Sequence, residues 1–186
     1  MAEQFRDIQD LDPKALARLV VDMLQRLILH HGLWFYEVKH QMGLEKAFEI
    51  YSRASETSLG IQLKKLAKLF GFQMQDGLPL PLLEMPRKKL IELMDTLAVN
   101  WLANDGVWFQ AVESKSGMID AKRCNDSCWA QFSPVEAWSI KKILDLPERP
   151  GLEGLKQALG LRLYARVNKQ SIIDEGSDSV IFQMNE

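Results

Sequence analysis

Apolar residues recur at helical spacing from Leu16 to Met42. One line of a helix with 3.6 residues per turn carries Val20, Leu24, Leu27, His31, Phe35, Val38 and Met42. This spacing predicts one long helix in which His31 occupies a position suited to leucine or isoleucine. Only a narrow strip of polar residues interrupts the apolar girth, so we expect the helix to be buried on more than one side. The strip consists of Arg18, Asp22, Gln25 and Arg26.

Capping residues set the ends of this helix and of the next. Asp12 followed by Pro13 is an N-cap with proline at the first helical position, and Gly43 favours a left-handed C-cap. A second helix is expected from about Leu44 to Phe70, ended by a glycine and lined by small residues. Small residues allow close approach, so the two helices are predicted to form an antiparallel hairpin.

The middle of the chain is predicted to alternate between helices and one strand. A third helix opens at Pro86, after a Pro- and Gly-rich connection, and ends in a turn formed by residues 104–106. Val107 to Ser114 is rich in β-branched and aromatic residues, which predicts a strand. A helix is then expected from Ile119 to Phe132. The capping box at residues 133–136 predicts another to about Leu144, and a short helix follows from Gly151 to Leu159.

Near Leu161 the pattern changes to alternation of apolar and polar residues, which predicts a half-buried strand from Leu161 to Ile172. Its polar face either receives a carboxylate or faces solvent; it carries Arg162, Tyr164, Arg166, Asn168 and Gln170. A turn at residues 174–178 leads to a second strand, Ser179 to Met184, and so predicts a hairpin. With Val107 to Ser114, these strands would form a sheet of at least three antiparallel strands.

The predicted fold class is α+β, mainly α: a long helical hairpin and further helices packed on a small antiparallel sheet. We expect a single domain over residues 1–186. It would comprise a lead-in at 1–12, a mainly helical part at 13–104 and a mixed part at 105–186 that ends in the β-hairpin.

The charge and composition of the chain argue against several classes of function. A net charge of −2 gives no electrostatic reason to bind nucleic acid or an anionic membrane. The acidic start lacks the apolar region of a signal peptide, and the apolar run at 19–29 is too short to span a bilayer. Cys124 and Cys128 suit two half-buried reduced thiols. We therefore expect a cytoplasmic protein.

The candidate ligand-binding residues are polar, aromatic or thiol side chains near the first helix or on a later one: His31, Trp34, Glu37, Gln41, Cys124 and Cys128. His31 is either a buried, hydrogen-bonded core histidine or a residue that lines a pocket between helices. Glu37 and His40 form an E-x-x-H pair, but a di-iron bundle needs this pair twice, and structural zinc needs four donors. We therefore expect no metal and no cofactor.

The segment 30–72 resembles the opening of a bacterial and archaeal family of unknown function whose members are usually labelled cytosolic proteins. The resemblance rests on His31, Gly32, Trp34, Phe35, Glu37, Gly43, Ala47 and the segment 62–71. Cys124 and the terminal VIFQMNE also lie where that family would have them. The family in turn resembles the L-2-amino-thiazoline-4-carboxylic acid hydrolases. Both groups carry further cysteines beyond the final strand, whereas the sequence here ends at Glu186.

Two functions of different classes follow. One is a non-catalytic small-molecule-binding domain, similar to vinyl-reductase sensory domains, with a pocket near the first helix. The other is a hydrolase of a small C–N substrate, with His31 and Glu37 as acid–base candidates. We favour binding, because no nucleophile is evident, and expect no thiazoline hydrolysis.

Because the first helix is apolar around most of its circumference, its remaining apolar side also predicts contacts with further helices. Leu19, Ile28 and Leu29 lie away from the line of His31, so we expect them to contact other helices of the same chain or a second copy in a homodimer.

Overall fold

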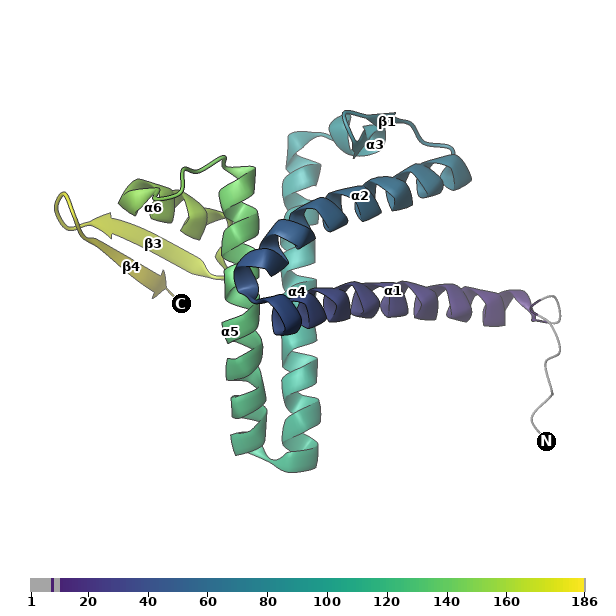
Figure 1. The fold of residues 1–186 in the computed structure, drawn as a ribbon, viewed down its shortest axis with the longest axis horizontal. Helices are drawn as coiled ribbons and strands as arrows, with labels where there is room; N and C mark the ends of the chain where they lie inside the picture. The colour runs from purple at the N-terminus through teal and green to yellow at the C-terminus, as the bar shows by residue number, and fades with distance from the viewer. Residues whose placement is uncertain (1–7, 9–10, 186) are drawn as a thin grey trace. The chain divides into compact units, whose positions relative to one another are not determined.

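The computed structural model describes residue 8 and residues 11–185. Its helices are α1 (Pro13–Met42), α2 (Leu44–Phe70), α3 (Leu80–Leu83), α4 (Arg87–Ser116), α5 (Met118–Ile143), α6 (Gly151–Leu161) and α7 (Tyr164–Val167) (Figure 1). Its strands are β1 (Met74–Gln75), β2 (Leu78–Pro79), β3 (Lys169–Asp174) and β4 (Val180–Asn185). The fold is mainly α with small antiparallel sheets, which confirms the predicted class. The predicted lead-in falls largely outside the described residues.

The chain divides into two compact units, Met1–Leu63 and Lys64–Glu186. The first holds α1 and most of α2, and the second holds the remaining elements. The expected single domain over residues 1–186 stays a prediction.

The first unit is the predicted helical hairpin. The Asp12 side chain accepts a hydrogen bond from the backbone N–H of Ala15 at 2.8 Å, which caps α1. Gly43 has φ 85°, a conformation that a side chain would strain, and lets the chain reverse into α2. Across the hairpin the ring of Phe35 lies 5.8 Å from that of Phe48 and 5.3 Å from that of Tyr51.

The expected burial of α1 and of His31 is wrong. None of the described residues of α1 is buried, and His31 is exposed. The His31 ring lies 5.5 Å from the Tyr51 ring. The physical reason is that one partner helix covers only one side of a helix that is apolar around most of its girth.

Residues 104–114 belong to α4, so the turn and the strand predicted there are wrong. The helix runs on through them, and its packed face continues from the fully buried Ala98 through Trp101, Asp105 and Phe109. Asp105 accepts hydrogen bonds from Asn125 Nδ2 of α5, at 3.4 Å to Oδ1 and 3.3 Å to Oδ2. Asp105 is a polar residue on this packed face and interrupts its apolar pattern. The sequence pattern therefore did not indicate that the helix continues.

Helix α5 also continues where the sequence predicts a break, because residues 133–136 do not start a new helix and Pro134 lies inside α5. The side chain of Glu136 is 8% exposed and accepts from Arg162 Nε at 3.0 Å. It also accepts from the backbone N–H of Leu163 at 2.8 Å. The Glu136 carboxylate is thus an acceptor, as a capping box requires, but its donors come from a later segment of the chain.

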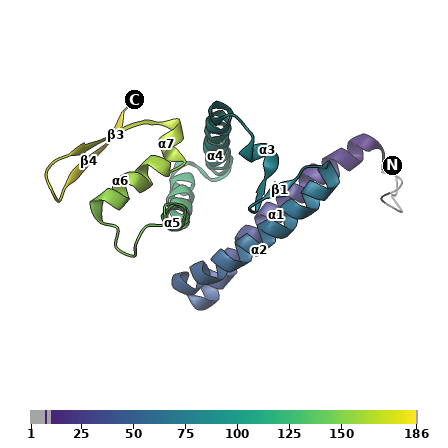
Figure 2. The ribbon, with the colours of Figure 1, turned by 90° about the horizontal axis from the view of Figure 1, so that it is seen from above.

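Four aromatic rings join the elements of the second unit. Trp101 of α4 lies 5.2 Å from Trp129 and 5.8 Å from Phe132, both on α5. Tyr164 of α7 lies 5.9 Å from Trp129 at an interplanar angle of 84°. Figure 2 shows α6, α7 and the β3–β4 hairpin to one side of the α4–α5 pair.

The terminal hairpin is confirmed, but the strand predicted from Leu161 is wrong over residues 161–168. Residues 164–167 form α7, and β3 pairs antiparallel with β4 in a register that sets Ile172 opposite Phe182. Arg162 and Arg166 bind carboxylates of α5 and α4, which holds this segment against helices. Arg166 Nε donates to Asp95 at 2.7 Å. The described sheets are two-stranded, β1–β2 and β3–β4, so the predicted three-stranded sheet is also wrong.

Candidate functional site

A groove between α1 and α2 contains two of the residues expected to bind a ligand. It encloses about 290 Å³ and is mainly apolar. Its lining residues are His31, Trp34, Phe35, Val38, Ala47, Ile50, Tyr51, Ala54 and Ser58. Glu37 and Gln41 are not among them, and on the exposed surface Gln41 Nε2 donates to Glu37 Oε1 at 2.7 Å.

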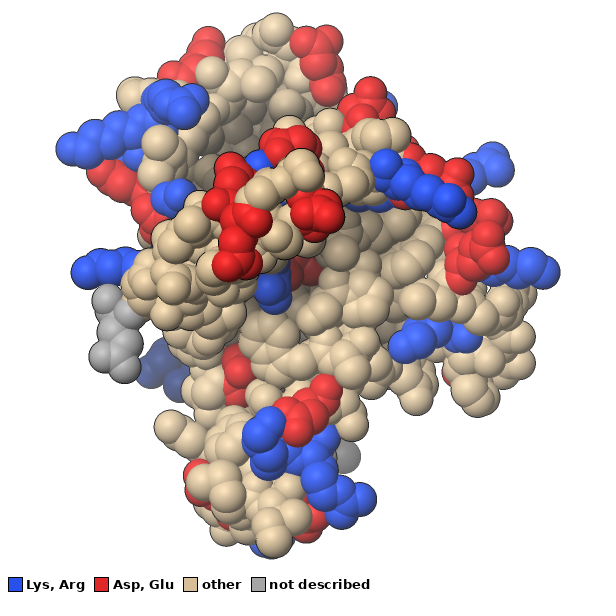
Figure 3. Space-filling view, turned by 90° about the vertical axis from the view of Figure 1, so that its left-hand side faces the viewer, with Lys and Arg blue, Asp and Glu red and all other residues tan. Residues whose placement is uncertain are grey.

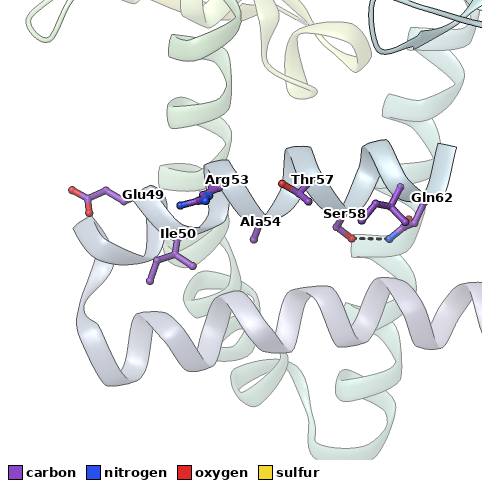
Figure 4. A pocket seen from close by; sticks show the side chains of 8 residues that line it. Glu49, Ile50, Arg53, Ala54, Thr57, Ser58 and Gln62 are labelled. Carbon is purple, nitrogen blue, oxygen red and sulfur yellow. Dashed lines mark hydrogen bonds between the residues drawn. The ribbon is translucent and has the colours of Figure 1, made fainter. Parts of the chain in front are cut away.

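A larger hollow of about 760 Å³ lies along α2 (Figure 4). All of its lining residues belong to this one helix, and Figure 4 shows Ile50 and Ala54 pointing toward α1. Ser58 accepts a hydrogen bond from Gln62 at 2.9 Å beside them. Because one helix cannot enclose a ligand, this hollow is an open surface.

Cys124 and Cys128 lie on α5 in the second unit, whereas the other four predicted residues lie in the first. Both cysteines are free and exposed, so the expectation of half-buried thiols is wrong. Among the residues that the structure describes, no three or more His, Cys, Asp and Glu side chains group in a way that could hold a metal ion.

The second unit contains a pocket that the sequence analysis did not find. It has a volume of about 390 Å³ and is built by α4, α5, α7, β4 and the link between α6 and α7. Its lining residues are Leu102, Asp105, Asn125, Trp129, Arg162, Tyr164 and Met184. Trp129 and Tyr164 supply aromatic rings, and Asp105, Asn125 and Arg162 supply polar groups.

The charges of this pocket are unequally compensated. Arg162 is paired with the buried carboxylate of Glu136. Asp105 is bonded to the neutral amide of Asn125, and no Lys, Arg or His of the described chain forms an ion pair with it. The pocket therefore carries one carboxylate that is available to a cation.

Surface charge does not mark a binding site on the face that Figure 3 shows. Lys and Arg side chains are interspersed there with Asp and Glu among the described residues. The candidate site is therefore defined by the side chains that line it.

Sequence reasoning placed Asp105 in a turn, and Arg162 and Tyr164 on the face of a strand. One signal for Asp105 was present, since it lies four residues after Trp101 and four before Phe109, as on one helical face. No local pattern relates Asp105 to Arg162 or Met184, which approach it only in the folded unit.

The fold and this pocket define a mainly helical α+β domain with a small polar and aromatic cavity. Residues 83–186, more than half of the chain, match a family of unknown function, DUF6125, and the chain belongs to this family. No curated protein and no solved structure matches the chain.

The matched segment contains every residue that lines the pocket of the second unit, whereas His31, Trp34, Glu37 and Gln41 lie outside it. In the described part of the chain, no helix has both the length and the apolarity to cross a membrane.

Proposed function

We propose that the protein binds a small organic amine in the pocket of the second unit, without catalysing a reaction. The single observation that carries this proposal is the Asp105 carboxylate, which lines an aromatic pocket and has no cationic partner among the described residues.

The side chains that line the pocket favour a ligand with a cationic group and an apolar part. Ammonium groups bind carboxylates and the faces of tryptophan and tyrosine, and Trp129 and Tyr164 both line the pocket. The volume of about 390 Å³ lies within the usual range for small-molecule sites, about 300–1,000 Å³. Leu102 and Met184 would contact the apolar part of the ligand.

Arg162 does not reverse this preference for a cation. Glu136 compensates its charge, so the arginine and its carboxylate together are neutral. The amide of Asn125 is placed to hold the Asp105 carboxylate and to fix its orientation.

Calorimetric titration with three probes of one shape tests this proposal: benzylamine, benzyl alcohol and benzoate. Benzylamine should bind at least about tenfold more tightly than the other two, because only it carries a cation. Asp105→Asn should remove this preference. Asp126→Asn, on the exposed surface of α5, should keep it. Equal binding of all three probes, or an unchanged preference in Asp105→Asn, would refute the proposal.

The groove of the first unit is the second candidate. His31 and Ser58 both line it, and the sequence resembles thiazoline hydrolases in this region. Ring opening of L-2-amino-thiazoline-4-carboxylate by the purified chain, lost in His31→Ala, would favour this function. No turnover would leave the amine-binding proposal in place.

We also infer that the protein works in the cytoplasm, because two exposed free thiols suit a reducing compartment. Fractionation of the source cells tests this inference, and recovery of the chain outside the cytoplasm would contradict it.

A further inference from the structure

Helix α1 carries one apolar line that α2 covers over only half of its length. The half toward Gly43 contacts α2 through His31 and Phe35, whose rings meet Tyr51 and Phe48. The half toward the N-terminus is open, with Val20 57%, Leu24 52% and Leu27 45% exposed. The two helices run apart from the turn at Gly43 (Figure 1), so α2 lies farther from the open half.

We propose that a second copy of this chain covers the open half, with the two α1 helices antiparallel and Leu24 facing its own counterpart. The two hairpins would then form a four-helix arrangement. This proposal concerns the first unit and does not depend on the amine site of the second.

The open half of α1 exposes large apolar side chains that would contribute to a dimer interface. An interface of standard size buries about 800 Å² on each partner. Along the open line and its flanks, the large apolar residues are between 38% and 74% exposed. They are Leu16, Val20, Met23, Leu24, Leu27 and Ile28.

The charge distribution on α1 favours a copy of the same helix over a charged partner. At about 100° per residue, the polar strip containing Arg18, Asp22 and Arg26 lies on the side of α1 opposite the open line. Asp22 and Arg26 also form an ion pair with each other at 2.7 Å. The open face therefore brings no like charges together when it meets its own copy, a requirement for a two-fold interface.

Substitutions at two adjacent residues of the full chain test this interface by sedimentation equilibrium. The wild-type chain should be a dimer. Leu24→Glu should raise the dimer dissociation constant on the order of 100-fold or more, because two buried carboxylates would face each other. Gln25→Glu adds the same charge on the polar strip and should leave the chain dimeric.

A disulfide test separates this interface from folding defects. In a background of Cys124→Ser and Cys128→Ser, mild oxidation of Leu24→Cys should give a covalent dimer, and Gln25→Cys should give much less. A monomeric wild-type chain, the same dissociation constant in Leu24→Glu and Gln25→Glu, or a Leu24→Cys thiol that stays monomeric would overturn the proposal. In the monomeric case, another part of the same chain would be the occupant of this face.

Discussion

The carboxylate of Glu136 binds Arg162 Nε at 3.0 Å and is 8% exposed, while the arginine side chain is 27% exposed. The same carboxylate accepts the backbone N–H of Leu163, so it ties α5 to the link between α6 and α7. Arg162 lines the candidate pocket, and this pair therefore connects the stability of the second unit to the shape of its site.

Glu136→Ala should lower the free energy of unfolding by about 2–4 kcal/mol, because it leaves a partly buried guanidinium and an N–H group without an acceptor. Glu136→Gln keeps an acceptor and should cost less. Urea denaturation measures both changes. Glu153→Ala, at a side chain that is 77% exposed, should cost under about 1 kcal/mol. An equal cost for the two alanine variants would show that the Glu136 pair has no special role.

Two glycines of α6 should respond oppositely to alanine. A Cβ on Gly154 would overlap the Pro150 ring and lie 3.5 Å from Leu146 Cδ1, so Gly154→Ala should destabilise by about 1–3 kcal/mol. A Cβ on Gly160 would meet nothing within 4 Å, and Gly160→Ala should stabilise by about 0.5 kcal/mol. Thermal unfolding compares the two. A neutral Gly154→Ala would mean that Pro150 and α6 do not pack in this way.

Gly106→Ala tests the continuity of α4. Gly106 has no positive φ, and an added Cβ would meet nothing within 4 Å, so alanine should stabilise the chain by about 0.5–1 kcal/mol. Gly117 ends the same helix with φ 89°, and Gly117→Ala should destabilise. Denaturant unfolding measures both. Destabilisation by Gly106→Ala would contradict a continuous α4 and would favour the turn that the sequence pattern predicts.

Lys156 links α6 to β3, and its hydrogen bonds to Glu153 and Asp174 raise its pKa above the ordinary value of 10.5. A pKa that is higher in the folded than in the unfolded chain adds stability that is fully present below the unfolded value. This stability is lost as the pH rises through the folded pKa. The free energy of unfolding should therefore fall more steeply above about pH 10.5 in the wild-type chain than in Lys156→Gln. Lys88→Gln, near the start of α4, should leave the pH profile unchanged. Identical profiles for wild type and Lys156→Gln would contradict this role.

The sequence by itself determined the elements whose signals are local. Asp12 and Gly43 bound α1, and a regular spacing of three and four residues fills it, so this helix and the hairpin with α2 follow from neighbours along the chain. The β3–β4 hairpin was found in the same way, from its turn residues and an alternating second strand.

Only the tertiary structure decided the segments whose polar groups bind distant partners. Asp105 and Asn125 are 20 positions apart, and Glu136 and Arg162 are 26 apart, so no local window contains both members of a pair. Asp105 makes its contact from the packed face of α4, the helix that contains residues 107–114, and Glu136 holds Arg162 beside helices, against the local strand propensity. His31 and Trp34 could be predicted to line a groove because they share one helix face. The pocket of Asp105, Trp129, Arg162 and Met184 could not, because it forms only where α4, α5, the α6–α7 link and β4 meet.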